Sequence, residues 1–467
     1  MSEQFDLVVV GAGPGGYVAA IRASQLGMKV AVVEKRATLG GVCLNEGCIP
    51  SKALLDSSEL FACARDKFAL HGIGVETPCL DLATMLARKD DVVKKLTDGV
   101  AYLFKKHKIR LLNGTAHVHG VNPSGMHRVG VDDDESVIAK KVLLATGSEP
   151  IPLSGIPFDG ELVVSAREAL AFEQIPDHLV VVGGGYIGLE LGSVWRRLGS
   201  SVTIIETLPG IIPSSDRQMA DNLQRALKKQ GIGFRLGTKV TGIRRLGNHA
   251  VIQYESESEI GEIECDRVLV AIGRKPLTSG LGIEALGITY DQTGRVQVDA
   301  DYQTSVPGMY AIGDLIPGPM LAHKASEEAV ACIERMHGKT TTVAYDCLPG
   351  VVYTWPEGAS VGKTEEQLKE RGIPYTSGKC NFIGNGRARA MNETEGFVKV
   401  LAHTETGRLL GVHIVGPRAS DLIAEAVAAM SFAGTAQDIG RLFHAHPTLS
   451  EALKEAALDV NKEAIHL

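Results

Sequence analysis

The sequence predicts an α/β protein in which two similar βαβ domains are followed by a smaller C-terminal α+β domain. Two observations support this prediction. The segment 8–35 reappears without a gap 172 residues later, as segment 180–207. Beyond about residue 345 the texture changes to short alternating apolar runs, which are typical of an antiparallel sheet. A chain of 467 residues is long enough for two to four domains of ~100–200 residues each.

The composition excludes several classes of protein. Hydrophobic residues make up 44% of the chain and charged residues 22%, which is typical of a globular protein without disorder. The 48 basic and 55 acidic residues give a net charge of −7, which argues against a nucleic-acid or anionic-membrane partner. No apolar run approaches the ~18 residues of a membrane span. The first strand pattern begins at Phe5, so we expect no targeting segment and a cytoplasmic location.

Each copy of the repeat has a strand pattern, a G-x-G-x-x-G turn, a helical stretch and a second strand pattern that ends in glutamate. In this context the glycines predict dinucleotide binding. The first glycine makes the tight turn, the second lets the backbone approach a pyrophosphate, and the third lets the helix pack on the strand. The glutamate would accept hydrogen bonds from ribose hydroxyls. The two sets are Gly11, Gly13, Gly16 and Glu34, and Gly183, Gly185, Gly188 and Glu206.

Three later strand patterns extend this organisation. "VLLATGSEPIP" from Val142 resembles "VLVAIGRKPLT" from Val268, so we expect each nucleotide domain to end on a similar strand and glycine turn. "TSVPGMYAIGDL" ends in Gly313 and Asp314, where the aspartate could hold sugar or ribityl hydroxyls. An ordinary turn explains the same pair of residues equally well.

The C-terminal part alternates between short strand patterns and helical stretches. "VVYTWPEGASVG" and "GFVKVLAHTETGRLLGVHIVG" predict an antiparallel sheet with hairpins. Thr364 and Gln367 form a capping box that opens a helix over "TEEQLKERG", and Gly372 ends it. "SDLIAEAVAAMSFAG" predicts a further helix.

Two of the eight cysteines, Cys43 and Cys48 in "GGVCLNEGCIPSK", are separated by only four residues. A metal clip, a structural disulfide and a redox pair all use such spacing. A zinc site would need a second Cys or His pair at clip spacing, which the chain lacks. A structural bridge would be unusual in an intracellular chain. The other six are expected to be small buried side chains: Cys63, Cys79, Cys265, Cys332, Cys347 and Cys380.

These features together resemble the flavin-dependent pyridine nucleotide-disulfide oxidoreductases, and most closely the branch that oxidises dihydrolipoyl groups with NAD+. The resemblance rests on "GGVCLNEGCIPSK", "YTWPEGASVGKTE" and "HAHPTLSE", and it covers nearly the whole chain. It implies two Rossmann-like dinucleotide-binding domains and a C-terminal interface domain that forms a homodimer. The implied domains are a FAD domain at 1–150 that resumes at 275–344, an NAD domain at 151–274 and the interface domain at 345–467.

The resemblance makes the cysteines a redox pair, in which Cys43 exchanges with substrate and Cys48 contacts the flavin. Lys52 follows one helical turn later if a helix starts near Pro50, and in the family this lysine lies beside the flavin. It is paired there with a glutamate that corresponds to Glu190. A solvated helix lysine is the ordinary alternative for Lys52, whereas a carboxylate in the apolar stretch "YIGLELG" needs a partner.

The resemblance also makes His446 the general base and Glu451 its orienting carboxylate, both acting on Cys43 of the other chain. Histidine suits this role because its ordinary pKa of ~6.5 lies near working pH. Spacing alone favours another role for Glu451, because Thr448 and Glu451 form a capping box for the last helix. His444 is expected to be a packing or hydrogen-bonding residue.

Glu206 predicts NAD rather than NADP, because a carboxylate at this position repels a 2′-phosphate. No arginine cluster follows Glu206 in this chain, whereas the NADPH-linked glutathione reductases carry such arginines. Besides the first glycine set, the family positions around FAD are Glu34, Lys35, Gly41, Lys52, Ala116, Thr146, Gly147, Ser148, Asp314, Met320, Leu321, Ala322 and His323. Those around NAD are Gly183, Gly185, Tyr186, Ile187, Gly188, Glu190, Glu206, Val240 and Gly273, with Tyr186 covering the nicotinamide pocket.

The implied reaction oxidises protein-bound dihydrolipoyl groups, and the partner is then a lipoyl protein of a 2-oxo acid dehydrogenase complex or of glycine cleavage. No metal is expected. Mercuric reductase is disfavoured because no cysteine follows Cys380. Single-cysteine oxidases and thiol-free transhydrogenases are disfavoured because both Cys43 and Cys48 are present. The alternative from another class is a flavin-bound, NADH-responsive binding module without disulfide turnover.

Overall fold

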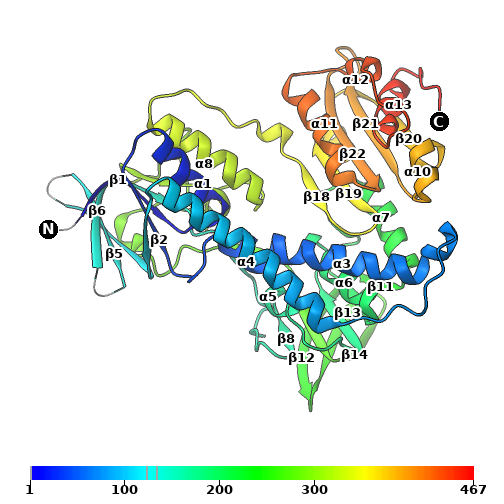
Figure 1. Cartoon of the computed structure of the whole chain (residues 1–467), viewed down its shortest axis with the longest axis horizontal. Coiled ribbons are helices and arrows are strands. Elements are labelled where there is room, and N and C mark those ends of the chain that lie inside the picture. The colour runs from blue at the N-terminus through cyan, green and yellow to red at the C-terminus, as the bar shows by residue number, and fades with distance from the viewer. Residues whose placement is uncertain (1–2, 123–124, 133–134) are drawn as a thin grey trace. The chain divides into compact units, whose positions relative to one another are not determined.

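The chain forms two compact units in the computed structural model, which describes residues 3–122, 125–132 and 135–467 (Figure 1). Each unit is assembled from three separate segments of the sequence. The long helix α3 (Cys48–Asp66) begins in unit 1 and continues into unit 2. Unit 1 comprises Met1–Ala53, Ala83–Ile151 and Gly273–Val343, and unit 2 comprises Leu54–Leu82, Pro152–Ile272 and Ala344–Leu467.

Unit 1 contains a seven-stranded sheet of order β3-β2-β1-β6-β5-β4, with β17 added beside β6. Its central strand β1 (Gln4–Val10) runs parallel to both neighbours, and its apolar run is buried because helices cover such sheets on both faces. Helices α1 and α8 pack against each other (Figure 1). The elements are α1 (Pro14–Gln25), β2 (Val30–Glu34), α2 (Gly41–Glu46), α4 (Leu82–Lys106), β3 (Arg110–Asn113), β4 (Ala116–Val121), β5 (His127–Val131), β6 (Glu135–Leu144), β7 (Ser148–Pro150), β16 (Arg274–Pro276), β17 (Met309–Ala311) and α8 (Ala322–Met336).

The first part of unit 2 repeats this design. A parallel sheet of order β11-β10-β9-β15-β8 is accompanied by the antiparallel sheet β12-β13-β14. Strands β9 and β10 with helix α6 occupy the places of β1, β2 and α1. The elements are β8 (Val163–Val164), α5 (Ala166–Ala169), β9 (His178–Val182), α6 (Tyr186–Leu198), β10 (Ser201–Glu206), α7 (Arg217–Lys229), β11 (Ile232–Leu236), β12 (Thr238–Leu246), β13 (His249–Ser256), β14 (Ile260–Cys265) and β15 (Arg267–Val270).

The second part of unit 2 is an antiparallel five-stranded sheet of order β18-β19-β22-β21-β20. Helix α11 packs on β19 and β22, and α13 packs on β20 and β21. The elements are β18 (Gly350–Val352), β19 (Glu357–Gly362), α9 (Glu365–Glu370), β20 (Tyr375–Asn381), α10 (Gly386–Met391), β21 (Phe397–His403), β22 (Leu409–Gly416), α11 (Ala419–Ser431), α12 (Ala436–Arg441) and α13 (Glu451–Asp459).

The predicted α/β class, the repeat and the C-terminal antiparallel sheet are confirmed. The capping box of Thr364 and Gln367 forms at the start of α9, and Gly372 follows its end in the left-handed conformation. Two local predictions were wrong. Helix α3 starts at Cys48 rather than near Pro50, so the second cysteine is its first residue. Three of the six cysteines expected to be buried are not: Cys79 is exposed, because residues 73–81 form no helix or strand, and Cys63 and Cys347 are only half-buried.

Candidate functional site

Both glycine turns have the geometry that the repeat predicted. Gly11 has φ of 98° and Gly183 has φ of 115°, a region that other residues rarely adopt. At each position a Cβ would also collide with backbone of the strand alongside, at Ala145 or Ala271. The turns lead into α1 and α6, whose N-caps are the second glycines of each set, Gly13 and Gly185.

The two glutamates bind the turns in the same way. Glu34 Oε2 accepts from the backbone N–H of Ala12 at 2.8 Å, and Glu206 Oε2 accepts from that of Gly184 at 2.7 Å. Their Oε1 atoms accept from the backbone N–H groups two residues further on, in Arg36 at 2.9 Å and Leu208 at 2.8 Å. The corresponding amides, Ala12 with Gly184 and Arg36 with Leu208, are each 172 residues apart, as in the sequence repeat. A carboxylate oxygen has lone pairs for more than one donor, so both glutamates can accept ribose hydroxyls as well.

The helix N-termini next to these turns suit an anionic ligand. Neither α1 nor α6 has a side chain that caps its first N–H groups, so these donors and the positive end of the helix dipole remain available. A Cβ on Gly185 would meet no atom within 4 Å, so there is open space in front of α6. In unit 1 the corresponding space borders Gly41, whose Cα would lie 3.8 Å from a Cβ on Gly13.

The two thiols lie together at the junction of two helices in unit 1. Cys43 is on α2 and Cys48 opens α3, and both are half-buried and reduced. The hydrogen bond between their side chains and the burial of the site raise the pKa of the Cys43 thiol well above its usual value. The positive charge of Lys52, one turn along α3, acts in the opposite direction. Cys43 therefore needs a base before it can react as a thiolate.

A polar cluster in unit 1 joins the first fingerprint domain to its later segment. The Ser148 hydroxyl donates to Asp314 at 2.5 Å, and Arg274 donates to the hydroxyl and carbonyl oxygens of Ser148 at 2.8 and 2.6 Å. Burial lowers the pKa of Arg274, while Asp314 and Cys48 are the nearest opposing charges. Arg274 was missed from the sequence, although it directly follows Gly273, a position that the repeat had marked.

Other predicted contacts of unit 1 lie around the same sheet. Thr146 donates from its hydroxyl to the carbonyl of Leu277 at 2.6 Å. Leu321 is the N-cap of α8, so the 320–323 segment lies at a helix N-terminus. Ala116 begins β4 and is buried. Gly147 has φ of 75° and open space beside it, as a position close to a ligand requires. Lys35 directly follows β2 and its glutamate, and it is exposed.

Predicted residues of the second nucleotide site are divided between the units. Tyr186, the first residue of α6, has its hydroxyl 3.3 Å from that of Ser215, and Ile187 beside it is exposed. Glu190 is buried and accepts from the backbone N–H of Tyr353 at 3.1 Å. Val240 lies on β12, at a bulge, in unit 2. Gly273 belongs to unit 1, as does Lys52, so the predicted Lys52–Glu190 pair stays a prediction.

His446 and Glu451 form a pair in front of α13. His446 is 79% exposed, and its Nδ1 lies 2.9 Å from Glu451 Oε1. Glu451 Oε2 accepts from the Thr448 N–H at 2.8 Å, so one carboxylate binds both groups. Burial raises the pKa of Glu451, but the hydrogen bonds from Thr448 and His446 outweigh it and lower this pKa.

The predicted capping role of Thr448 was wrong. The N-cap of α13 is Ser450, and the Thr448 hydroxyl instead donates to the carbonyl of Ala445 at 2.8 Å, because the helix begins later than expected. His444 is a hydrogen-bonding residue, as predicted. Its Nε2 lies 2.8 Å from Glu425 Oε1, and only 5% of its side chain is exposed.

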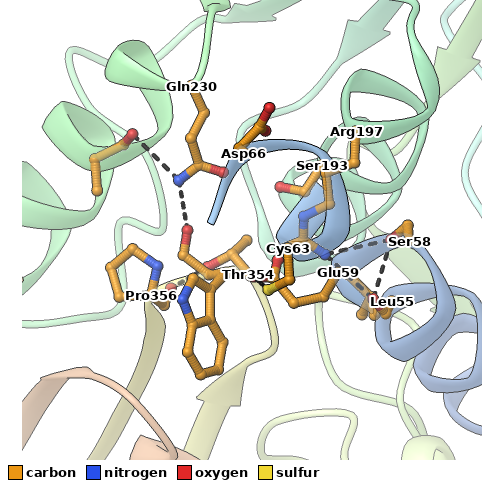
Figure 2. Close-up of polar contacts among 12 residues, drawn as sticks. Leu55, Ser58, Glu59, Cys63, Asp66, Ser193, Arg197, Gln230, Thr354 and Pro356 are labelled. Carbon is orange, nitrogen blue, oxygen red and sulfur yellow. Dashed lines mark hydrogen bonds and ion pairs between the residues drawn. The ribbon is translucent and has the colours of Figure 1, made fainter. Parts of the chain in front are cut away.

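Helix α3, which starts at the second cysteine, is fastened in unit 2 to helix α6 by one buried arginine (Figure 2). Arg197 lies 3.1 Å from Glu59 and donates to the Leu55 carbonyl and the Ser58 hydroxyl at 3.3 and 3.4 Å. Its side chain is 6% exposed, and burial lowers its pKa. A charge buried in this way fixes its partners because no alternative arrangement satisfies it.

Two classes of site are absent from the described part of the chain. No group of three or more His, Cys, Asp or Glu side chains there could hold a metal ion. No helix there has both the length and the apolar character that crossing a bilayer requires.

Comparison with known proteins decides the family. Residues 5–329 match the family described as pyridine nucleotide-disulphide oxidoreductase, and residues 348–457 match its dimerisation domain. The chain belongs to the pyridine nucleotide-disulphide oxidoreductase family. Members of this family use FAD and a nicotinamide nucleotide, here NAD+/NADH, and the dimerisation domain indicates a homodimer. The uncapped N-termini and paired glutamates of the two fingerprints fit two such nucleotides.

Several members of the family are similar to this chain over all or nearly all of their length. Dihydrolipoyl dehydrogenase 3 of Pseudomonas putida is 50% identical, with all of both chains covered. The mitochondrial dihydrolipoyl dehydrogenase of Pisum sativum is 48% identical, with 100% of this chain and 93% of the relative covered. The crystal structure of LpdA from Mycobacterium tuberculosis superimposes with a TM-score of 0.88 at 25% identity, covering 97% of this chain and 99% of that one.

Proposed function

We propose that this pyridine nucleotide-disulphide oxidoreductase oxidises protein-bound dihydrolipoyl groups to the lipoyl disulfide with NAD+ as acceptor. The observation that carries the proposal is the adjacent Cys43–Cys48 thiol pair in the same unit as the first dinucleotide fingerprint. Full-length similarity to dihydrolipoyl dehydrogenases supports the choice of substrate. The overall reaction is N6-dihydrolipoyl-lysine + NAD+ giving N6-lipoyl-lysine + NADH + H+.

The thiol chemistry balances when the enzyme starts with a Cys43–Cys48 disulfide. A substrate thiolate attacks Cys43 Sγ, which forms a mixed disulfide and releases Cys48 as the thiolate. The second substrate thiol, once deprotonated, attacks the sulfur bound to Cys43, closes the lipoyl disulfide and releases Cys43. The substrate thereby loses two electrons and two protons, and the cysteine pair gains the electrons. Bound FAD supplies the route by which this electron pair reaches NAD+.

His446 is the proposed base that takes the substrate protons. Its exposure leaves the ring open to a group outside its own chain, and Glu451 fixes Nδ1, so Nε2 is the nitrogen available for proton transfer. In a homodimer the thiols that it serves are Cys43 and Cys48 of the other chain. Lys52 beside the thiols, with its proposed partner Glu190, favours negative charge on the reduced centre.

The two fingerprints divide the cofactors. We assign FAD to the set with Gly11 and Glu34 and NAD to the set with Gly183 and Glu206. Glu206 selects NAD because its carboxylate would repel the 2′-phosphate of NADP. The proposed FAD domain then comprises residues 1–150 and 275–344, the proposed NAD domain residues 151–274, and the proposed interface domain residues 345–467.

The proposal of a lipoyl protein as partner rests only on the chemistry of its dihydrolipoyl group. A lipoyl protein of a 2-oxo acid dehydrogenase complex or of glycine cleavage would present the same dihydrolipoyl arm. A cytoplasmic location is proposed as well, although the relative from Pisum sativum is mitochondrial.

The first test is NADH formation by the purified, FAD-loaded protein from NAD+ and dihydrolipoamide. We expect fast turnover that is lost with NADP+. Cys43→Ser should abolish turnover while flavin reduction by NADH continues, and Cys79→Ser, a change at an exposed cysteine, should leave turnover unchanged. Flavin reduction by NADH without dihydrolipoamide turnover would overturn the proposed substrate but keep the family. Unchanged turnover in Cys43→Ser would overturn the thiol mechanism.

A further inference from the structure

A cavity of about 440 Å³ lies in unit 2 between α7 of the second fingerprint domain and strands β20 and β21 of the C-terminal sheet. This volume is within the ~300–1,000 Å³ range of small-molecule sites. The proposed reaction uses none of its residues. It is lined by Gln218, Asp221, Gln224, Arg225, Lys228, Lys379 and Phe397.

Contacts at both ends of α7 hold this helix, and with it one wall of the cavity, in place. Before its first residue, the Asp216 carboxylate is fully buried and binds Lys399 Nζ of β21 at 2.9 Å. At its end, Gln230 donates to the carbonyl of Trp355 at 2.5 Å (Figure 2), and Lys229 pairs with Glu395 at 2.6 Å. A helix attached at both ends keeps the gap beside the sheet open, so the cavity is already formed before any ligand arrives.

The cavity is lined by cations without carboxylate partners. Arg225 and Lys228 lie three residues apart on one face of α7, and Lys379 faces them from β20. Within the described part of the chain, none of these three forms an ion pair. The single lining carboxylate, Asp221, could pair with Arg225 one turn away but binds Arg217 instead.

Lys379 is the most constrained of the three. Its ammonium group lies 4.1 Å from the centre of the Phe397 ring, which forms the floor of the cavity. Burial, Lys399 and Arg225 lower the pKa of Lys379, and Asp216 only partly opposes them. Lys399 itself is compensated, because Asp216 and Glu365 both bind it. The cavity therefore concentrates positive charge, because its three cations outnumber the single lining carboxylate, Asp221, which binds Arg217.

Cations near the C-terminal end of a helix also interact favourably with the helix dipole, which would explain Arg225 and Lys228 without a ligand. The dipole does not explain Lys379, which comes from a strand and is repelled by its neighbours. The side-chain amides of Gln218 and Gln224 add neutral donors to the same space.

We propose that this cavity binds a small oxyanion with two or more negative charges, such as a pyrophosphate group. The guanidinium and two ammonium groups would form charge-assisted hydrogen bonds to its oxygens. The ligand would contact both α7 and the C-terminal sheet, so its binding would stabilise their association. Free pyrophosphate and the diphosphate of a nucleotide share this chemistry.

The test is calorimetric titration of inorganic pyrophosphate into the dimeric holoenzyme with FAD bound and NAD+ at saturation, which keeps both fingerprint sites occupied. We expect one site per chain. Arg225→Gln combined with Lys228→Gln should raise the dissociation constant at least about tenfold, because each lost charge-assisted bond weakens binding. Arg371→Gln removes an exposed cation at the end of α9, outside the cavity lining and outside the contacts that hold α7, and is the control; it should change the dissociation constant less than about twofold.

No binding of pyrophosphate by the wild-type protein would overturn the proposal, as would equal binding by the double variant or an equal loss in Arg371→Gln. A parallel titration with ADP separates the two sources of the group. Tighter binding of ADP than of pyrophosphate, lost in the double variant, identifies a nucleotide; equal or weaker binding identifies the free anion. The test does not involve dihydrolipoamide turnover, so its outcome is independent of the proposed function.

Discussion

Single carboxylates define both the cofactor sites and the stability of this protein. Glu34 and Glu206 each bind one backbone amide of their glycine turn and one amide two residues further along the chain, so each proposed ribose-binding carboxylate is held in place. A third carboxylate, Glu365, has a structural role, because its oxygens lie 2.6 Å from Lys399 and 2.9 Å from Lys369. Glu206 and Glu365 each lead to a separate prediction.

Replacing Glu206 with alanine should relax the selection against NADP+. The repulsion between its carboxylate and a 2′-phosphate disappears, so the ratio of kcat/KM for NAD+ to that for NADP+ should fall about tenfold or more. Steady-state kinetics with both nucleotides measures this ratio. Glu255→Ala, which removes an exposed carboxylate from β13, should leave the ratio unchanged. An unchanged ratio in Glu206→Ala would show that another residue selects the nucleotide.

The contribution of Glu365 to stability should depend on pH. Burial raises its pKa, but hydrogen bonds from Lys399, Lys369 and Tyr375 outweigh burial and lower it from 4.5 to about 2. A lowered folded-state pKa stabilises the protein above the unfolded value, and this stabilisation is lost as pH falls toward 2. Urea unfolding of wild type and Glu365→Gln should therefore differ near neutral pH and converge progressively as the pH falls from 4.5 toward about 2. A difference that grows on acidification would contradict the assignment.

At the scale of elements, two helices of unit 2 are held by buried or short polar contacts rather than by apolar packing alone. Arg197 fastens α6 to α3, which carries the second cysteine at its first residue (Figure 2). Asp216 and Gln230 attach α7 to the C-terminal sheet and its preceding loop. These contacts fix helix positions because a buried charge tolerates only one arrangement.

Glu59→Gln should destabilise the protein by about 2 kcal/mol, because it leaves the Arg197 guanidinium buried without its counter-charge. Denaturant unfolding measures the change. Asp66→Asn is the matched control: it breaks the exposed Arg65–Asp66 pair on the same helix and should cost less than about 0.5 kcal/mol. Equal costs for the two variants would mean that Arg197 gains little from Glu59.

At the scale of the whole molecule, the proposed active site is completed by the dimer. His446 is 79% exposed in the single chain, although a general base must reach a reacting proton in a site that excludes water. The dimerisation domain at residues 348–457 contains this histidine. The proposed arrangement places one thiol pair and the other chain's histidine in each site.

Mixed dimers test this arrangement. A dimer with Cys43→Ser in one chain and His446→Gln in the other has one site with both wild-type groups if the base acts across the interface. Its dihydrolipoamide turnover should be roughly half that of wild type, since one of two sites is intact. Each variant homodimer should be at least about 100-fold slower than wild type. Failure of the mixed dimer to recover activity would place the base within its own chain.

The sequence by itself determined the α/β class, the two fingerprints and the thiol pair. These are local patterns: a βαβ unit needs a strand period, a glycine turn and a helix period within about 30 residues, and each has a direct physical cause. The backbone amides that Glu34 and Glu206 bind in the glycine turns are separated by the same 172 residues as the repeat.

Only the tertiary structure decided which distant residues meet. Arg274 joins Ser148 and Asp314, Arg197 joins Glu59, and Lys379 faces Arg225, at sequence separations that no local pattern encodes. It also decided the start of α13 at Glu451, with Ser450 rather than Thr448 as the N-cap. Long-range polar contacts depend on how elements pack, and packing is a property of the whole chain.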